Sequence, residues 1–496
     1  MGALAPMSFF SAKRERRRWR CRRQIRRHGG SIASVATTKC VQCQHEDSSQ
    51  GGKASELYLP EDILRHIHGL MPLRDAARAA CVSHTFMRSW RHHPHLTFTE
   101  ETLGLNKNPV TQDDITGDFI NKIMHILQNH DGTGVKALEL ELFRCSSIDS
   151  SYLDGWLHIA VTPGIERLTI MFPSDSNARY SNKAGYNKAG YNCKAGYNSK
   201  AGYDFPCSLL FDRGGDSVRY LHLSQCAFRP TVDLGCLRSL SQLHLCFVRI
   251  TGDELELFLS KSFVLESLRL SYCDEIIRMK IPCLLQRLSN LQANIVSYAL
   301  TNLLSVVPNV ETFTIHSRNE ITNTPMVPGK FLHLKYLNIH FVAVTFSPAY
   351  DYFSLVSFLD ASPSLETFFL SVTQRLMEHD SIFGESVHLR QLPEHRHESL
   401  KSVKISGFCS AKSMVELTCH ILENASSLEC LTLDTTNGAA RCSASKSGKC
   451  LPMWKDVLIE AHKALLAIST CIEGKVPLTV KLNVVEPCTG CHAVEL

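Results

Sequence analysis

The sequence lacks several features that would place it in a common class. It has no apolar run near the ~18 residues that a membrane-spanning helix needs, and its start lacks the apolar stretch of a secretory signal. Its 20 cysteines among 496 residues are too few for a disulfide scaffold, so we expect an intracellular chain with reduced thiols. The signatures G-x-x-x-x-G-K-S/T, G-x-S-x-G and H-E-x-x-H do not occur, and we therefore expect no enzyme and no catalytic residue.

Excess charge of one sign is confined to one place. The formal net charge is +5, but residues 13–27 hold ten Lys or Arg and one Glu, or +10 − 1 = +9. The other residues therefore sum to +5 − 9 = −4, which argues against a nucleic-acid partner for the body of the chain. The composition of residues 1–54 predicts a disordered, Arg-rich head. Three interpretations of it are open: a nuclear-import or nucleic-acid-contacting signal, a transit peptide, and a solvated tail without a specific function. We expect a nuclear or cytoplasmic location.

Residues 57–98 predict three short helices. Pro60 suits the first turn of a helix, and the two acids that follow it suit the positive helix end. Apolar residues then recur at helical spacing from Ile63 to Leu70, and an alanine-rich second helix surrounds Ala76. A third helix ends before Pro94. A unit of about 40 residues is too small to form a large core alone, so its apolar surface predicts docking on a partner.

From about residue 135 the chain repeats the pattern apolar-x-x-apolar-x-apolar. Eleven copies have these first residues: Val135, Ile165, Val218, Leu240, Leu265, Leu288, Val310, Leu334, Leu365, Leu400 and Leu428. The central copies recur every 22–25 residues, which is the spacing of leucine-rich repeats, and the longer intervals require insertions in loops. The pattern predicts a solenoid in which each repeat adds one strand.

One repeat shows the physical reason for stacking. Thr251 and Glu254 have the spacing of a helix-capping box, and the apolar residues after them lie on one helical face. Leu265, Leu268 and Leu270 then form a strand with inward side chains. Neither half can bury its apolar face alone, so neighbouring repeats must stack.

Two segments depart from the repeat pattern. Lys-Ala-Gly-Tyr occurs four times within about residues 180–203, which predicts a flexible low-complexity insert, with a ligand-contacting loop as the alternative. Residues 437–450 predict a loop of small residues. After it, residues 454–468 read as an amphipathic helix and residues 478–484 as a strand. We expect this helix and strand to cap the open end of the solenoid.

Two parts of the sequence resemble a known protein family. The segment from Leu57 to Ile67 and the segment from Met71 to Ser83 look like an F-box, with Phe86 and Trp90 at its aromatic positions. Residues 400–434 resemble the C-terminal FBD-like region of plant F-box/leucine-rich-repeat proteins. The implied fold class is α/β, a short helical F-box module followed by a leucine-rich-repeat solenoid. Its parallel strands would line the concave face, with helices and loops on the convex face.

The resemblance implies a substrate-recognition subunit of a Skp–cullin–F-box ubiquitin ligase. A Skp-type adaptor, and through it cullin, would bind the F-box residues Leu59, Pro60, Ile63, Leu64, Ile67, Leu73, Ala76, Ala77, Val82 and Trp90. By strand alternation, an unknown protein substrate would contact concave positions such as Arg269, Ser271, Asn338 and His340. The alternative is a non-catalytic scaffold with a degenerate F-box, because His84-Thr85-Phe86 and Ala76-Ala77 depart from the family pattern.

The expected organisation follows the motifs along the chain. The parts are the head at 1–54, the F-box at 55–98, a helical linker at 99–134, the repeats at 135–435 and the loop with capping elements at 436–496, the FBD-like region being about 400–496.

Several chemical motifs are weighed and set aside. Cys488-Thr-Gly-Cys491-His492 has the spacing of c-type haem attachment, but no export signal accompanies it. It could bind zinc together with Cys40 and Cys43, although about 450 residues separate the two pairs. The histidines around Pro94 predict a polar loop, and Asp113-Asp114 predicts a helix start. The sequence thus predicts no cofactor and no metal.

Overall fold

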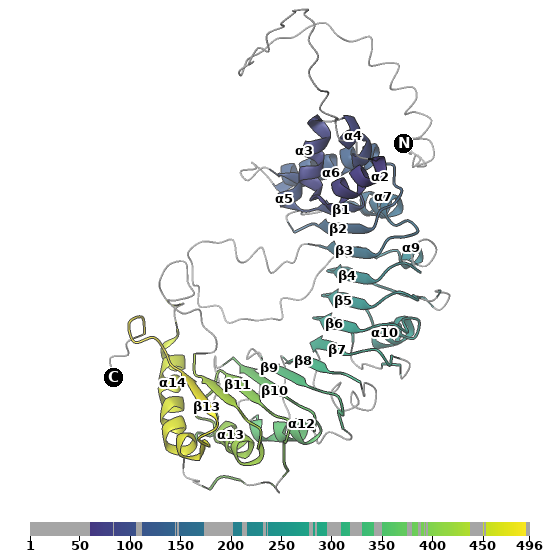
Figure 1. Ribbon diagram of the computed structural model, residues 1–496. Helices are drawn as coiled ribbons and strands as arrows, with labels where there is room; N and C mark the ends of the chain where they lie inside the picture. Colours follow the sequence, from purple (N-terminus) through teal and green to yellow (C-terminus); the bar gives the residue numbers. More distant parts are fainter. Residues whose placement is uncertain are drawn as a thin grey trace, which may run out of the picture. The chain divides into compact units, whose positions relative to one another are not determined.

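We describe the protein from a computed structural model (Figure 1). The described residues belong to one compact unit, Leu59–Leu496. They span 60–492 except for 83, 106–111, 144, 146–147, 173–201, 211–215, 232–234, 236, 277–280, 283–284, 295–308, 318–329, 342–349, 374–378, 385–387, 391, 393–394, 437–449 and 451–452. The Arg-rich head, nearly all of the Lys-Ala-Gly-Tyr insert and most of the predicted loop 437–450 therefore lie outside them.

The described residues build one parallel sheet of 13 strands in which each strand pairs with its neighbours in sequence (Figure 1). The sheet is open and curved, as a solenoid requires. Its strands are β1 His95–Phe98, β2 Ala137–Glu141, β3 Arg167–Met171, β4 Tyr220–Ser224, β5 Gln242–Cys246, β6 Ser267–Ser271, β7 Asn290–Asn294, β8 Thr312–Ser317, β9 Tyr336–Phe341, β10 Thr367–Val372, β11 Ser402–Ser406, β12 Cys430–Asp434 and β13 Lys481–Val485.

Alternation along each strand explains the sheet. In β6, Leu268 and Leu270 are buried, whereas Arg269 between them is exposed. Leu268 lies in register with Leu243 on β5 and Leu291 on β7, and all three are fully buried. Because successive side chains of a strand point to opposite faces, the repeated leucines form continuous buried rows. Each fully buried leucine contributes roughly 1.5–3 kcal/mol, and the rows hold neighbouring repeats together.

Helices and short turns connect the strands. They are α2 Glu61–Leu70, α3 Leu73–Val82, α4 His84–Trp90, α5 Glu100–Leu103, α6 Gln112–Asn129, α7 Ser150–Ala160, α9 Cys207–Leu209, α10 Gly252–Leu259, η3 Tyr352–Leu355, α12 Val356–Asp360, α13 Lys412–Asn424, α14 Lys455–Ala467, η4 Ile468–Ile472 and η5 Glu473–Lys475. The predicted capping box of α10 is present: the Thr251 hydroxyl accepts from the Glu254 N–H, and the Glu254 carboxylate accepts from the Thr251 N–H. Within the described residues, no helix is long and apolar enough to cross a membrane.

The ends of the sheet differ from the sequence prediction. Residues 95–98 were assigned to the helical module, but they form β1, whose Leu96 and Phe98 are fully buried. The sheet therefore begins directly after α4. At the other end, the predicted final strand begins only at Lys481, and Leu478 is fully exposed. The predicted helix is present as α14, which buries Ala461, Ala464 and Ala467.

Candidate interaction surfaces

Helix α2 carries an apolar face that stays exposed to solvent in the described part of the chain. Ile63, Ile67 and Leu70 are 42%, 41% and 72% exposed. Their i, i+4, i+7 spacing places them on one side of the helix. A contiguous exposed apolar face on a soluble domain indicates a protein-binding surface. We call Ile63, Ile67 and Leu70 the α2 face.

The structure separates the sequence-predicted F-box residues into three groups. Pro60, Ile63, Ile67 and Val82 are exposed, and Leu64, Ala77 and Trp90 are half-buried. Leu73 and Ala76, in contrast, lie inside the fold, so they hold α3 in place and offer no surface to a partner. Leu59 lies outside the described residues. Sequence reasoning left Leu70 out of the site, although its spacing from Ile63 identifies it.

Three buried histidines fix the backbone beneath the α2 face. The Nε2 atom of each ring faces a backbone carbonyl: His68 donates to the Ala76 carbonyl (2.9 Å), His93 to the Met71 carbonyl (3.2 Å) and His130 to the His93 carbonyl (3.0 Å). The His93 Nδ1 lies against the backbone of His95, 2.9 Å from its carbonyl oxygen and 3.2 Å from its nitrogen. Burial lowers the pKa of His93 to about 4. The prediction of a polar loop around Pro94 is therefore wrong for His93, which is 1% exposed.

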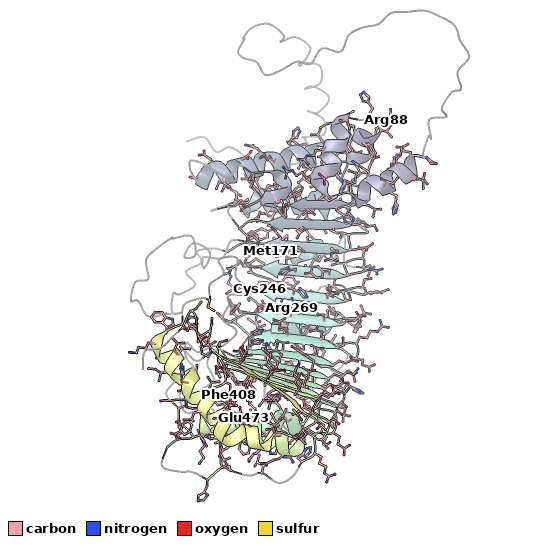
Figure 2. All side chains as sticks on the ribbon, turned by 60° about the vertical axis from the view of Figure 1, so that its left-hand side comes forward. Arg88, Met171, Cys246, Arg269, Phe408 and Glu473 are labelled. Carbon is pink, nitrogen blue, oxygen red and sulfur yellow. The ribbon has the colours of Figure 1, made fainter. Side chains whose placement is uncertain are left out.

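The second surface is the face of the sheet opposite the leucine rows. The strand register places one outward side chain from each strand in a line that we call the concave row: Thr97, Glu139, Thr169, His222, His244, Arg269, Gln292, Thr314, Asn338, Phe369, Lys404, Thr432 and Asn483. Met171, Cys246 and Arg269, labelled in Figure 2, mark three of the strands that form this face.

A basic and aromatic patch occupies β3 to β6, formed by Arg167, Tyr220, His222, His244 and Arg269. The Arg167 guanidinium lies 4.6 Å from the Tyr220 ring centre, and the Tyr220 hydroxyl is 3.2 Å from His244 Nδ1. Burial, followed by the charge of Arg269, lowers the pKa of His222, and lowers that of His244 to about 4. Both imidazoles are therefore neutral near pH 7, and the positive charge comes from the two arginines. We call this the first concave patch.

A second patch lies on β7 to β11, formed by Gln292, His316, His340, Phe369 and Lys404. The His316 and His340 rings stack at 4.5 Å with an interplanar angle of 3°. His340 contacts Phe369 edge-on at 5.5 Å, and the Lys404 ammonium lies 5.4 Å from the same ring. Burial lowers the pKa of His340, which favours the neutral ring. We call this the second concave patch.

Two of the four predicted substrate contacts belong to these patches, Arg269 to the first and His340 to the second, and the other two lie on the same strands. Arg269 is exposed in the first patch, and Ser271 lies half-buried on the same strand. Asn338 and His340 lie half-buried on β9, and the Asn338 side-chain oxygen is a buried acceptor without a hydrogen-bond partner among the described residues. Applying the same alternation to every strand would also have identified Arg167, Tyr220 and Phe369. It would not have shown which outward residues contact one another.

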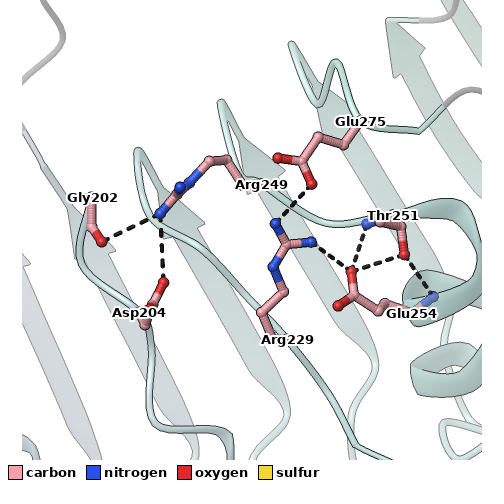
Figure 3. A network of polar contacts seen from close by, with 7 residues as sticks. All are labelled: Gly202, Asp204, Arg229, Arg249, Thr251, Glu254 and Glu275. Atoms are coloured by element: carbon pink, nitrogen blue, oxygen red, sulfur yellow. Dashed lines mark hydrogen bonds and ion pairs between the residues drawn. The ribbon is translucent and has the colours of Figure 1, made fainter. Parts of the chain in front are cut away.

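Ion pairs at the strand ends hold consecutive repeats in register (Figure 3). The Arg229 guanidinium donates to Glu254 and to Glu275, both at 2.8 Å. Burial alone would raise the pKa of Glu254, but hydrogen bonds from Thr251 and Arg229 outweigh it and lower this pKa. Arg249 contacts Asp204 at 3.5 Å, just after the insert. These contacts link neighbouring repeats beside the strands that carry the first concave patch.

Comparison with protein families agrees with this geometry. The F-box domain family matches residues 57–97. The family described as At1g61320/AtMIF1, LRR domain, matches residues 126–184, 193–294 and 290–489, which is more than half of the chain. The chain belongs to this leucine-rich-repeat family. The predicted F-box/leucine-rich-repeat architecture is thus confirmed, and the F-box/LRR chain is a protein-interaction adaptor. No curated protein matches it. The resemblance of residues 400–496 to an FBD region, and the plant origin, stay predictions.

Proposed function

We propose that the F-box/LRR chain is the substrate-recognition subunit of a Skp–cullin–F-box ubiquitin ligase. The observation that carries the proposal is an F-box whose α2 face exposes Ile63, Ile67 and Leu70 while buried hydrogen bonds hold the backbone beneath it. F-box domains bind Skp-type adaptors and through them cullin. The α2 face and Val82 are the apolar groups that this chain offers for that contact.

Such a subunit needs no nucleophile of its own. It holds a target lysine near a charged ubiquitin carrier and so raises the effective concentration of the two reactants. The concave patches would hold the target. Their arginines, lysine and aromatic rings fit a protein segment that carries acidic and aromatic side chains.

The departures from the family pattern support a second candidate function, a scaffold without ligase recruitment. Ala76 is fully buried, so its small size changes the interior of the module and not the adaptor-facing surface. Phe86 is half-buried and stacks on His68 at 5.2 Å. Ala76 and Phe86 therefore lie behind the α2 face, whereas His84 and Thr85 are exposed on α4 and Ala77 is half-buried. None of these positions belongs to the α2 face itself, which favours the ligase subunit over the scaffold.

Adaptor binding is the decisive test. The chain is titrated with a purified Skp-type adaptor, and the Ile63→Asp/Ile67→Asp variant is compared with a Leu332→Asp control, which changes another exposed apolar residue. Loss of two anchoring side chains should weaken binding by roughly 2 kcal/mol or more, about 30-fold, while the control binds normally. If the folded native chain fails to bind the adaptor, the scaffold function is preferred.

Substrate capture tests the concave surface separately. Affinity purification with the proteasome blocked should recover partners that Arg167→Ala/Arg269→Ala loses and that Lys335→Ala retains. Lys335 is an exposed lysine outside the concave row, paired with Glu311. Equal recovery by all three chains would place the substrate elsewhere.

We also propose that the chain acts in the nucleus or the cytoplasm, which rests on the sequence alone. A fluorescent fusion of the full chain, compared with one lacking residues 1–54, tests this location and the role of the Arg-rich head. A third possibility, nucleic-acid binding by that head, requires binding that falls steeply with salt and disappears with the deletion.

A further inference from the structure

Three cysteine thiols converge at the C-terminal end of the repeats. The Sγ atoms of Cys450, Cys488 and Cys491 all lie within 4.8 Å of one another. Cys450 and Cys488 are half-buried and Cys491 is exposed. The sequence motif at 488–492 did not identify Cys450. This cysteine lies 38 residues before Cys488 in the sequence, and only the fold brings the two close together.

The local backbone suits the two later thiols to one ligand site. The N–H groups of Cys491 and His492 both donate to the Cys488 carbonyl, at 3.2 and 2.8 Å. This tight turn brings the two thiols of the Cys-x-x-Cys motif to the same side. In a tetrahedral zinc site, Zn–S bonds of about 2.3 Å place sulfur atoms about 3.8 Å apart. The three sulfur atoms all lie within 4.8 Å of one another, so shifts of about 1 Å or less would bring them to that separation.

These cysteines differ from those in the core. Cys273 and Cys409 are buried core residues, and burial raises the pKa of each thiol to about 12, so both act as small apolar side chains. The three clustered thiols reach solvent and fill no core position. A disulfide would use two of them and leave the third unexplained.

Two other groups of possible ligands among the described residues are less suited to zinc. In the first, His379 and Glu460 already form an ion pair at 3.2 Å beside the buried Cys409. In the second, Asp360 already faces His397 at 3.7 Å. Neither group brings more than one thiol, whereas thiolates are the ligands that most favour zinc in a reducing compartment.

The position of the three cysteines would allow a bound metal to stabilise the C-terminal end of the solenoid. Cys450 precedes α14, and Cys488 follows β13, which is the last strand of the sheet and pairs only with β12. Every described side chain of β13 is at least partly exposed, in contrast to the buried leucines of the inner strands. The open end of a solenoid needs a cap, and a crosslink between the start of α14 and the end of β13 would provide one.

We propose that Cys450, Cys488 and Cys491 bind one Zn²⁺ that closes the C-terminal cap of the solenoid. Each thiol releases its proton to solvent as its Zn–S bond forms, and a fourth ligand from outside the cluster completes the tetrahedron. The site is independent of adaptor binding, because the α2 face lies at the other end of the strand order.

Zinc content of the full chain, purified under reducing conditions, tests the proposal. We expect one zinc per chain, lost in Cys450→Ser and in Cys488→Ser. It should be retained in Cys471→Ser, which changes a half-buried cysteine of the same region outside the cluster. It should also be retained in Cys40→Ser/Cys43→Ser. A chain without zinc, zinc lost only with Cys40 and Cys43, or a disulfide within the cluster would overturn the proposal.

A second readout does not depend on variants that could misfold. The native chain loaded with Co²⁺ should show thiolate-to-cobalt charge transfer and the intense visible bands of tetrahedral cobalt. Chelation should speed amide hydrogen exchange in β13 and leave α2 unchanged. A weak octahedral cobalt spectrum, or exchange in β13 that ignores the chelator, would contradict a structural site.

Discussion

Acidification should loosen the F-box helices through His93. This imidazole is 1% exposed, donates to the Met71 carbonyl, contacts the backbone of His95 through Nδ1 and lies 5.8 Å from the Trp90 ring. It therefore ties the turn between α2 and α3 to β1. Protonation would place a charge in this buried position, and burial accordingly lowers its pKa to about 4.

The size of the effect follows from proton linkage. The folded pKa of about 4 lies below the unfolded value of 6.5, so the neutral side chain stabilises the fold fully above about pH 6.5. This contribution decreases as the pH falls toward 4. At pH 5 the unfolded histidine is almost wholly protonated and the folded one is mostly neutral. The difference destabilises the module by about 2 kcal/mol, or roughly 30-fold in its opening equilibrium.

Hydrogen exchange of peptides from α2, α3 and α4 measures that equilibrium locally, once intrinsic exchange rates at pH 7 and pH 5 are corrected for. His93→Gln should reduce the pH dependence, because its side chain does not titrate, and His130, whose pKa is also lowered by burial, should supply part of the remainder. His84→Gln, which changes an exposed histidine of α4, should keep it. Equal pH dependence in the native chain and in His93→Gln would refute the reasoning.

Two further predictions concern the repeats, both measured by urea denaturation. Leu268→Ala should cost about 2–5 kcal/mol, because Leu268 is fully buried between the leucines of two neighbouring strands, whereas Arg269→Ala should change the free energy of unfolding by less than about 0.5 kcal/mol. Arg390→Gln should lower the free energy of unfolding by about 3 kcal/mol, because the fully buried Glu416 carboxylate would lose its two guanidinium hydrogen bonds. Adding Glu416→Gln should recover most of this loss. If the double variant recovers none of it, the unpaired Glu416 charge is not the cause.

The sheet could be predicted from sequence because each inner strand repeats the same local signal. Every predicted repeat triplet lies on or just before a strand, and Leu168, Leu221 and Leu243 pair in register as the repeats require. Strand β1 could not be recognised in this way. It has only four residues, His95–Phe98, and its inward Leu96 and Phe98 become a strand only because β2 offers a pairing edge.

The sequence predicted which elements carry the interaction surfaces, but not how deeply each of their side chains is buried. Helical spacing identified the side of α2 that carries Ile63 and Ile67, but spacing gives a face and not its burial. On α3, the F-box resemblance gave Leu73 and Ala76 as adaptor contacts, although both lie inside the fold. His93 was assigned to a polar loop because its decisive partner, the Met71 carbonyl, is 22 residues away in sequence.

The connection between the F-box helices and the repeats affects how a ligase subunit would work. The buried core is continuous from Leu73 of α3 through Leu96 and Phe98 of β1 into the leucine rows, and the half-buried Trp90 packs against it. The Lys136 N–H also donates to the Pro94 carbonyl at 2.7 Å, which links the end of the module to the start of β2. The F-box therefore packs as the first layer of the solenoid and is not a separate domain on a flexible linker. Catalysis by proximity depends on a fixed separation between adaptor and substrate, so a continuous core of this kind suits the proposed function better than it suits a passive scaffold.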